Sequence, residues 1–289
     1  MKAQLFIDAK CTLAEGPLWH HLRGELLWFD IYGQKLFVAG LDGAVRQTFS
    51  FDQPVSAAAI IDEDTVAVAA ASALWHFDLV TGVKSLIAPL EDDLPDNRSN
   101  DGRVDPAGGF WIGTMRRAED RPDGAVYQYR AGQMRKLFGD VTITNSMCFA
   151  PDGRTAYFSD TVTRRILKCA IDAEGRPEGE WTLFADVSEG PGYPDGSVVD
   201  AEGYVWNARW GGSCVVRHAP DGRVVQTVEL PAANVTCPAF GGPDLRTLFV
   251  TTARKNLSEA ELAVQPGAGG IFKLDDAGVG GQKETSLKL

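Results

Sequence analysis

The sequence predicts an all-β fold, a six-bladed β-propeller of four-stranded blades around a central channel. Three observations favour it. Turn clusters rich in Asp, Pro and Gly recur along the chain, a β-rich apolar run follows each cluster, and the copies repeat at roughly 40–50 residues. This is the period expected for a four-stranded propeller blade. The alternative is a generic all-β sandwich, which the even period over nearly the whole chain disfavours.

The predicted blades are aligned on their turns. The clearest turns are at residues 105–108, 151–153, 200–203 and 242–244. Apolar strands follow at residues 110–113, 155–158, 204–206 and 247–250, and two less regular copies lie upstream at 26–29 and 65–68. Third strands are expected at residues 34–38, 73–77, 125–129 and 165–169. Many of these alternate apolar and polar residues, which is typical of half-buried strands.

The last repeat lacks a fourth strand of its own. Only a short apolar run at 270–274 and a polar tail follow it. Residues 4–7 are therefore expected to supply the missing strand and to close the ring. The segment 256–264 is the best candidate for a short helix, with Ser258 as its N-cap.

Composition restricts the class of protein. With 289 residues, 44% of them hydrophobic, the chain can form a single propeller domain over residues 1–289. The net charge of −11 disfavours nucleic acid as a partner. Five scattered cysteines without a Cys-x-x-Cys pair disfavour both a disulfide framework and a zinc-thiolate site. No signal-peptide core or membrane-length apolar run is visible, so we expect a cytoplasmic protein with no membrane partner. The sequence leaves the oligomeric state open, and a monomer is compatible with it.

Polar residues recur at one position of the repeat. Counting back about five residues from each turn gives Glu15, Val55, Asn100, Asn145, Asp195 and Cys237. The first strand of each propeller blade lines the central channel, so these residues should meet at one mouth of that channel. An Asn or Asp before Gly is usually a turn former. Here the residues lie at the end of the strand away from the hairpin turn, which favours a shared site.

Two carboxylates with one or two amides form an oxygen-rich site, which favours Ca²⁺, Mg²⁺, Mn²⁺ or Fe²⁺ over a thiolate zinc site. Such a cation polarises a carbonyl and acidifies a water, and a neighbouring carboxylate can act as a general base. This chemistry is metal-assisted hydrolysis of an ester or lactone. Arg98 is suited to bind substrate oxygens, although a surface pair with Asp96 or Asp101 is equally consistent. Serine-hydrolase and zincin chemistry is disfavoured because no Gly-x-Ser-x-Gly or His-Glu-x-x-His is present.

With these residues the chain resembles the senescence marker protein-30, gluconolactonase and luciferin-regenerating enzyme family, in particular its bacterial sugar lactonases. The resemblance covers nearly the whole length and is carried by residues 14–19, 98–108, 111–115, 145–161, 193–206 and 241–253. It implies a six-bladed propeller with one divalent metal in the channel, with Ca²⁺, Zn²⁺, Mn²⁺, Mg²⁺ and Fe²⁺ all open.

The resemblance also implies roles for individual residues. Glu15, Asn145 and Asp195 match the metal ligands, and Asp195 matches the catalytic acid or base. Arg98 and Asn100 match substrate-binding residues. Glu119 is a further substrate-binding candidate, although its segment is out of register with the family by about one residue.

The implied reaction is hydrolysis of a sugar lactone, such as a glucono- or pentonolactone, to the aldonic acid. Two alternatives stay open. One is a calcium-binding regulatory propeller without catalysis, and the other is an organophosphate or aryl esterase on the same metal.

Overall fold

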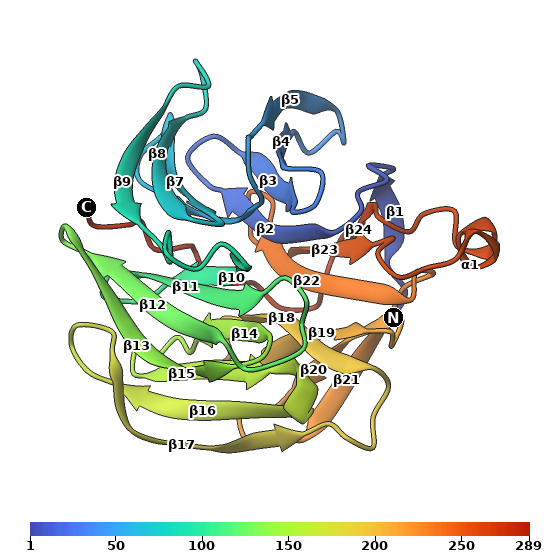
Figure 1. Ribbon diagram of the computed structural model, residues 1–289. Helices are drawn as coiled ribbons and strands as arrows, with labels where there is room; N and C mark the ends of the chain where they lie inside the picture. Colours follow the sequence, from blue (N-terminus) through green and yellow to red (C-terminus); the bar gives the residue numbers. More distant parts are fainter.

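The structure is a computed structural model that describes residues 1–289, and it confirms the six-bladed propeller. Six antiparallel sheets of four strands each stand around a central axis (Figure 1). The first strands of neighbouring sheets contact one another around this axis, as in β10 with β6 and β18 with β22. The site is therefore set by the first strand of each blade.

We number the blades 1 to 6 in chain order. Blades 1 and 2 contain β2 (Ala14–His20), β3 (Glu25–Asp30), β4 (Lys35–Ala39), β5 (Val45–Ser50), β6 (Val55–Ile60), β7 (Thr65–Ala70), β8 (Ala73–Asp78) and β9 (Lys84–Pro89). Blades 3 and 4 contain β10 (Asn97–Val104), β11 (Phe110–Arg116), β12 (Gly124–Arg130), β13 (Gln133–Val141), β14 (Thr144–Phe149), β15 (Thr155–Asp160), β16 (Arg165–Ile171) and β17 (Pro177–Asp186). Blades 5 and 6 contain β18 (Tyr193–Val199), β19 (Val205–Trp210), β20 (Cys214–His218), β21 (Val224–Glu229), β22 (Asn234–Gly241), β23 (Thr247–Ala253), β24 (Ile271–Leu274) and β1 (Gln4–Ile7).

The ring closes through β1, which confirms the sequence prediction. β1 pairs antiparallel with β24 and becomes the outer strand of blade 6, in the order β1-β24-β23-β22. The predicted short helix is also present as α1 (Glu259–Val264), and Ser258 with Glu261 forms a capping box at its N-terminus. A 3₁₀ turn, η1 (Thr161–Thr163), follows β15. No helix of the chain is long and apolar enough to cross a membrane.

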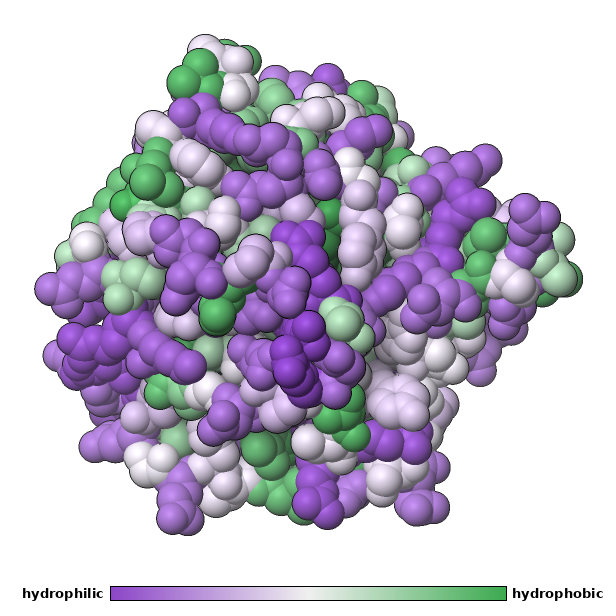
Figure 2. All heavy atoms as spheres, in the orientation of Figure 1, coloured by the Kyte–Doolittle hydropathy of each residue, from purple (hydrophilic) through white to green (hydrophobic).

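The core lies between the blades. Tryptophans on the second strands of blades 1, 3 and 5 are completely buried: Trp28, Trp111 and Trp206. All six residues of the inner strand β6 are buried, whereas the outer strand β5 is mostly exposed. The face seen in Figure 2 is mainly hydrophilic, with small and scattered hydrophobic patches. Apolar side chains therefore stabilise the ring from inside, as burial between stacked sheets requires.

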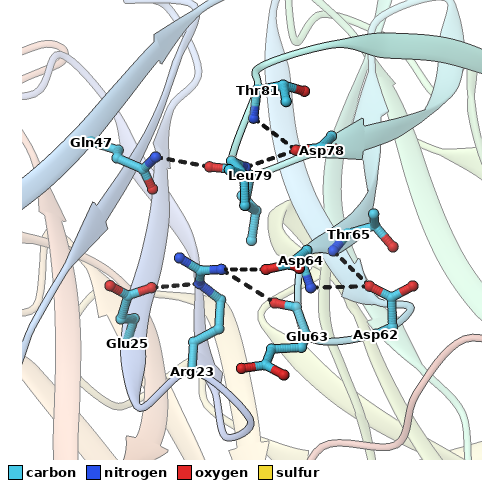
Figure 3. A network of polar contacts seen from close by, with 11 residues as sticks. Arg23, Glu25, Gln47, Asp62, Glu63, Asp64, Thr65, Asp78, Leu79 and Thr81 are labelled. Atoms are coloured by element: carbon cyan, nitrogen blue, oxygen red, sulfur yellow. Dashed lines mark hydrogen bonds and ion pairs between the residues drawn. The ribbon is translucent and has the colours of Figure 1, made fainter.

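Polar contacts join blades 1 and 2 near their hairpin turns (Figure 3). Arg23 donates to Glu25 at 2.6 Å and to Asp64 of the next blade at 3.0 Å. Gln47 donates to the carbonyl of Leu79 at 2.8 Å. The Asp64 side chain is largely exposed, so its ion pair with Arg23 adds little to stability.

Every inner strand carries an irregularity in its pairing near its start. Pairing with the second strand shifts between Glu15/Leu18, Val55/Ala57, Ser99/Gly102, Asn145/Cys148, Pro194/Ser197 and Val235/Pro238. A bulge of this kind re-aims side chains and is common next to active sites. Gly16 shows how tight the packing is here: its φ is +55°, and a Cβ would lie 2.2 Å from the Ser56 carbonyl oxygen.

The bulges refine the predicted alignment. Asn100 and Asp195 are the first residues inside their bulges, whereas Glu15 and Asn145 immediately precede theirs. In blade 6 the count back from the turn selects Cys237, but the bulge begins one residue earlier, at Thr236.

The C-terminal segment crosses the end of the channel opposite the bulges. The Gln282 amide donates to the carbonyls of Phe149 and Val199, both at 3.1 Å, and these residues end the inner strands of blades 4 and 5. The Leu287 amide donates to Ile60, which ends the inner strand of blade 2, at 2.7 Å. The chain terminates on the side of the ring away from α1 (Figure 1).

Candidate functional site

The six residues that the sequence predicts for the site line one cavity. It has a volume of about 90 Å³ and opens at the mouth where the inner strands begin. The predicted residues in its wall are Glu15, Arg98, Asn100, Glu119, Asn145 and Asp195. The structure therefore brings the whole predicted set together, from blades 1, 3, 4 and 5.

The Asn145 side chain is held in one orientation. The Thr161 hydroxyl donates its single proton to the Pro194 carbonyl at 2.9 Å, so it can only accept from the Asn145 amide nitrogen, 2.8 Å away. The amide oxygen of Asn145 then points away from Thr161. Asn100 is held in a similar way, because its amide donates to the Thr144 carbonyl at 2.8 Å and lies 3.3 Å from the Asn145 oxygen.

Arg98 lies inside the site and not on the surface. Its side chain is 1% exposed, and it donates to the Ser99 carbonyl at 2.9 Å and to the Asn100 amide oxygen at 2.7 Å. The alternative of a surface pair with Asp96 or Asp101 is wrong. Because the Asn100 oxygen is engaged by Arg98, these two residues act as one polar unit beside the carboxylates. The Nε of Arg98 has no partner.

Glu15 and Asp195 are buried carboxylates without an ion-pair partner. Burial, together with the nearby Asp101 carboxylate, raises the pKa of Glu15 to about 8. Burial and the Glu15 charge raise the pKa of Asp195 well above its usual range, and Lys255 opposes this rise. Without a cation, the site therefore favours the protonated forms of both carboxyl groups.

Asp101 is a third carboxylate of this region, and the sequence did not mark it as part of the site. It follows Asn100 in the β10 bulge, and burial raises its pKa. Its oxygens accept from the amides of Met147 at 2.9 Å and Gly102 at 2.8 Å. It therefore ties the bulges of blades 3 and 4 together below the cavity.

This donor set fits a divalent cation. A cation would offset the mutual repulsion of Glu15 and Asp195, and the amide oxygen of Asn145, which accepts only the 3.3 Å contact from Asn100, is the kind of neutral ligand that hard cations accept. No three His, Cys, Asp or Glu side chains form a metal-binding group in this chain. A cation here would therefore rest on two carboxylates and one amide, completed by water, as the sequence predicts.

Blades 2 and 6 contribute no such ligands. Their bulges carry Ser56 and Thr236, whose hydroxyls are satisfied by the Ser99 hydroxyl at 2.8 Å and the Ala14 carbonyl at 2.6 Å. The candidate oxygen ligands Glu15, Asn145 and Asp195 lie on blades 1, 4 and 5, so the site is one-sided, as expected from the sequence.

Two further residues of the wall were missed by sequence reasoning. Thr161 follows β15 and orients Asn145, but a threonine after a strand carries no distinctive signal. Lys255 follows β23, and its ammonium pairs with the Glu119 carboxylate. Glu119 has a left-handed φ of 58°. Its presence in the cavity wall agrees with the prediction, and its role in binding substrate stays a prediction.

Comparison with known proteins gives a consistent result. Residues 13–254 match the family model described as SMP-30/Gluconolactonase/LRE-like region. The chain is 37% identical over 279 residues to an L-arabinolactonase of Azospirillum brasilense, covering 94% of this chain and 91% of the relative. It is 34% identical to a 6-deoxy-6-sulfogluconolactonase of Pseudomonas putida, over 90% of each chain. The crystal structure of a calcium-binding protein, regucalcin, from Agrobacterium tumefaciens superposes with a TM-score of 0.96 at 39% identity, covering 99% of this chain and 97% of that one.

Proposed function

The chain belongs to the SMP-30/gluconolactonase/LRE-like family, and we propose that it is a metal-dependent lactonase that hydrolyses a sugar lactone to the aldonic acid. One observation carries the proposal. Two buried carboxylates without a counter-charge, Glu15 and Asp195, face an oriented amide oxygen beside a buried arginine. The lactonases among the relatives support the same reaction class.

Each residue has a defined task in this proposal. Glu15, Asn145 and Asp195 would hold a divalent cation, which supplies polarisation of the lactone carbonyl and a more acidic water. Asp195 would accept a proton from the attacking water. Arg98 and Asn100 would bind sugar oxygens, because a guanidinium held by an amide has its remaining N–H groups fixed in direction.

The calcium-binding alternative keeps one supporting observation, since the Agrobacterium tumefaciens structure at 39% identity is that of a calcium-binding protein. That role would use the carboxylates but would not need Arg98 buried in the same cavity. The esterase alternative would use the apolar part of the wall, where Met115 and Trp210 lie. Both alternatives predict substrate profiles different from that of a sugar lactonase.

The test is a substrate panel on chelated and reloaded protein. Protein stripped of metal receives Ca²⁺, Mg²⁺, Mn²⁺, Zn²⁺ or Fe²⁺, each in a separate reaction. Acid release is then followed with gluconolactones, L-arabinonolactone, paraoxon and phenyl acetate, against protein-free reactions because lactones also hydrolyse spontaneously. We expect turnover of at least one sugar lactone that depends on the added metal.

Other outcomes contradict the proposal. Tight metal binding without turnover of any lactone supports the calcium-binding role. Faster cleavage of paraoxon or phenyl acetate than of every sugar lactone supports the esterase. Full lactone turnover in the chelated protein contradicts the dependence on metal.

A further inference from the structure

Lys255 reaches the cavity from the blade opposite Glu119. The lysine follows β23 of blade 6 and the glutamate follows β11 of blade 3, so their ion pair spans the mouth of the ring. The two side chains are 18% and 28% exposed. This pair differs from an ordinary surface ion pair, because it is mostly enclosed and both residues line the cavity.

The backbone at Lys255 is held on both sides. Its amide donates to the Thr12 carbonyl at 2.9 Å, and the amide of Arg254 donates to the same oxygen at 3.1 Å. The Lys255 carbonyl accepts from the side chain of Asn234 at 2.8 Å, and Asn234 is itself 5% exposed. The base of the lysine side chain is therefore fixed, as is typical of residues that position a ligand.

Tyr32 of blade 1 holds the head of the lysine from a third direction. The Lys255 ammonium lies 5.3 Å from the centre of the Tyr32 ring, and the Arg98 guanidinium carbon lies 5.5 Å from the same centre. Cations at this distance are attracted to an aromatic face. Lys255 and Arg98 therefore lie beside the same aromatic ring, and both line the cavity together with Glu15 and Asp195.

We infer that Lys255 is a specificity-determining residue that binds the end of the sugar lactone remote from the reacting carbonyl, and this inference rests on the proposed function. The ammonium has three N–H donors and Glu119 supplies acceptor oxygens. Sugar hydroxyls both donate and accept, so the pair matches a neutral, hydroxyl-bearing end.

The same pair disfavours an anionic substituent at that end. An anion would compete with Glu119 for the ammonium and would place a second negative charge next to a carboxylate that is only 28% exposed. In this interpretation the Glu119 carboxylate excludes anions. The Lys255 ammonium attracts them once the charge of Glu119 is removed.

Two lactones that differ at a single carbon provide the test. D-glucono-1,4-lactone carries a hydroxymethyl group at C6, where D-glucaro-1,4-lactone carries a carboxylate. In the metal-loaded protein, Lys255→Met should raise KM for the gluconolactone about tenfold with little change in kcat, because a binding contact is lost. Glu119→Gln should raise the ratio of kcat/KM for the glucarolactone over the gluconolactone by about tenfold or more. Lys255→Arg should retain most of the wild-type KM.

Lys84→Met is the matched control. Lys84 also pairs with a carboxylate, Asp52, at 2.7 Å and lies 4.9 Å from the centre of the Trp75 ring, but it is on the outer strand β9 of blade 2. This variant should leave both lactone reactions unchanged.

The outcomes separate the inference from the proposed function. A wild-type protein that hydrolyses no lactone contradicts the proposed function itself. If the wild type is active, an unchanged KM in Lys255→Met or an unchanged substrate ratio in Glu119→Gln overturns the inference. Equal losses on both lactones with a lowered melting temperature also overturn it, because they indicate a purely structural role.

Discussion

The two ends of the central channel handle charge in opposite ways. At the site end, Glu15 and Asp195 are buried without a cationic partner, and the pKa of each is raised. At the far end, Arg103 is paired with Glu284 of the C-terminal segment, and the two side chains are 12% and 17% exposed. Both ends are built from the same inner strands.

The comparison shows what distinguishes a binding site from a structural contact. In β10, Asn100 belongs to the site and Arg103, three residues later, belongs to the closed end. Asn100 lies in the β10 bulge and Arg103 lies in the regularly paired part of the strand that follows it. Where the protein supplies the counter-charge itself, the polar group stabilises the fold. Where it does not, the free energy of neutralisation is available to a ligand.

The largest expected effect is at the site end. Asp195→Ala should lower kcat/KM for the best lactone by about 10³-fold or more, because a proposed ligand and general base is lost. In chelator, the free energy of unfolding should stay the same or rise, since a repelling buried carboxylate is removed. Steady-state kinetics and thermal melts measure both; turnover comparable to the wild type would contradict the assigned role.

At the closed end, a substitution is expected to lower stability and to leave turnover nearly unchanged. Glu284→Gln leaves Arg103 without its partner and should lower the free energy of unfolding by about 2–4 kcal/mol. The value of kcat/KM should stay within about threefold, because the cavity is at the other mouth. Glu202→Gln, which removes the exposed partner of Arg217, is the control and should have almost no effect on stability. A large loss of turnover in Glu284→Gln would break the separation between the two ends.

The third prediction concerns pH in the chelated protein. Folded Glu15 holds its proton up to a pKa of about 8, whereas the unfolded chain loses it near 4.5. The folded state therefore binds more protons, and stability should fall by about 1–2 kcal/mol between pH 6.5 and 8. The pH range starts at 6.5 because of His20 and His218. Burial lowers the pKa of each histidine to about 4, so below pH 6.5 their titration makes stability rise with pH.

Chemical denaturation at a series of pH values measures this change in stability, and two additions to the series test whether Glu15 causes it. Glu15→Gln should reduce the slope between pH 6.5 and 8, because one of the two buried carboxyls with a raised pKa is absent. A bound divalent cation should also flatten it by holding the carboxylates ionised. A wild-type slope that is insensitive to both changes would rule out Glu15 as its source.

The smallest expected effect is on ligand orientation. Thr161→Val removes the hydroxyl that accepts from Asn145, so metal affinity should fall about tenfold while the fold is retained. Metal titration by calorimetry measures the change. Thr163→Val is the control, because its exposed hydroxyl donates to the Asp160 carbonyl at 2.7 Å and does not contact the cavity. Similar affinities in both variants would show that the Thr161 contact does not orient the ligand.

Much of the fold was predictable because its signals are local and repeated. The turn period, the closing strand at Gln4–Ile7 and the Ser258 cap each depend on short stretches of sequence. The convergence of Glu15, Asn145 and Asp195 was predictable because a ring brings equivalent positions together. The one-residue offsets among them were not, since they arise from bulges that pairing with the second strand creates.

The position of Lys255 in the cavity wall could not be predicted from the sequence, for another reason. Its direction depends on Thr12 and Asn234, which are distant in sequence and belong to different parts of the ring closure. No turn or period marks such a contact. Asp101 was also missed, because an Asp before Gly has the same appearance whether it shapes a turn or joins two bulges.

The closing strand has a consequence for synthesis of the protein. β1 leaves the ribosome first, yet its partner β24 is made about 270 residues later, at Ile271–Leu274. Until then, β1 has no strand to pair with, and the blades form an open arc with an unpaired edge at each end. The first strand therefore stays without its sheet partner while the other blades are made, and the ring around the candidate site is complete only when the first and last strands pair.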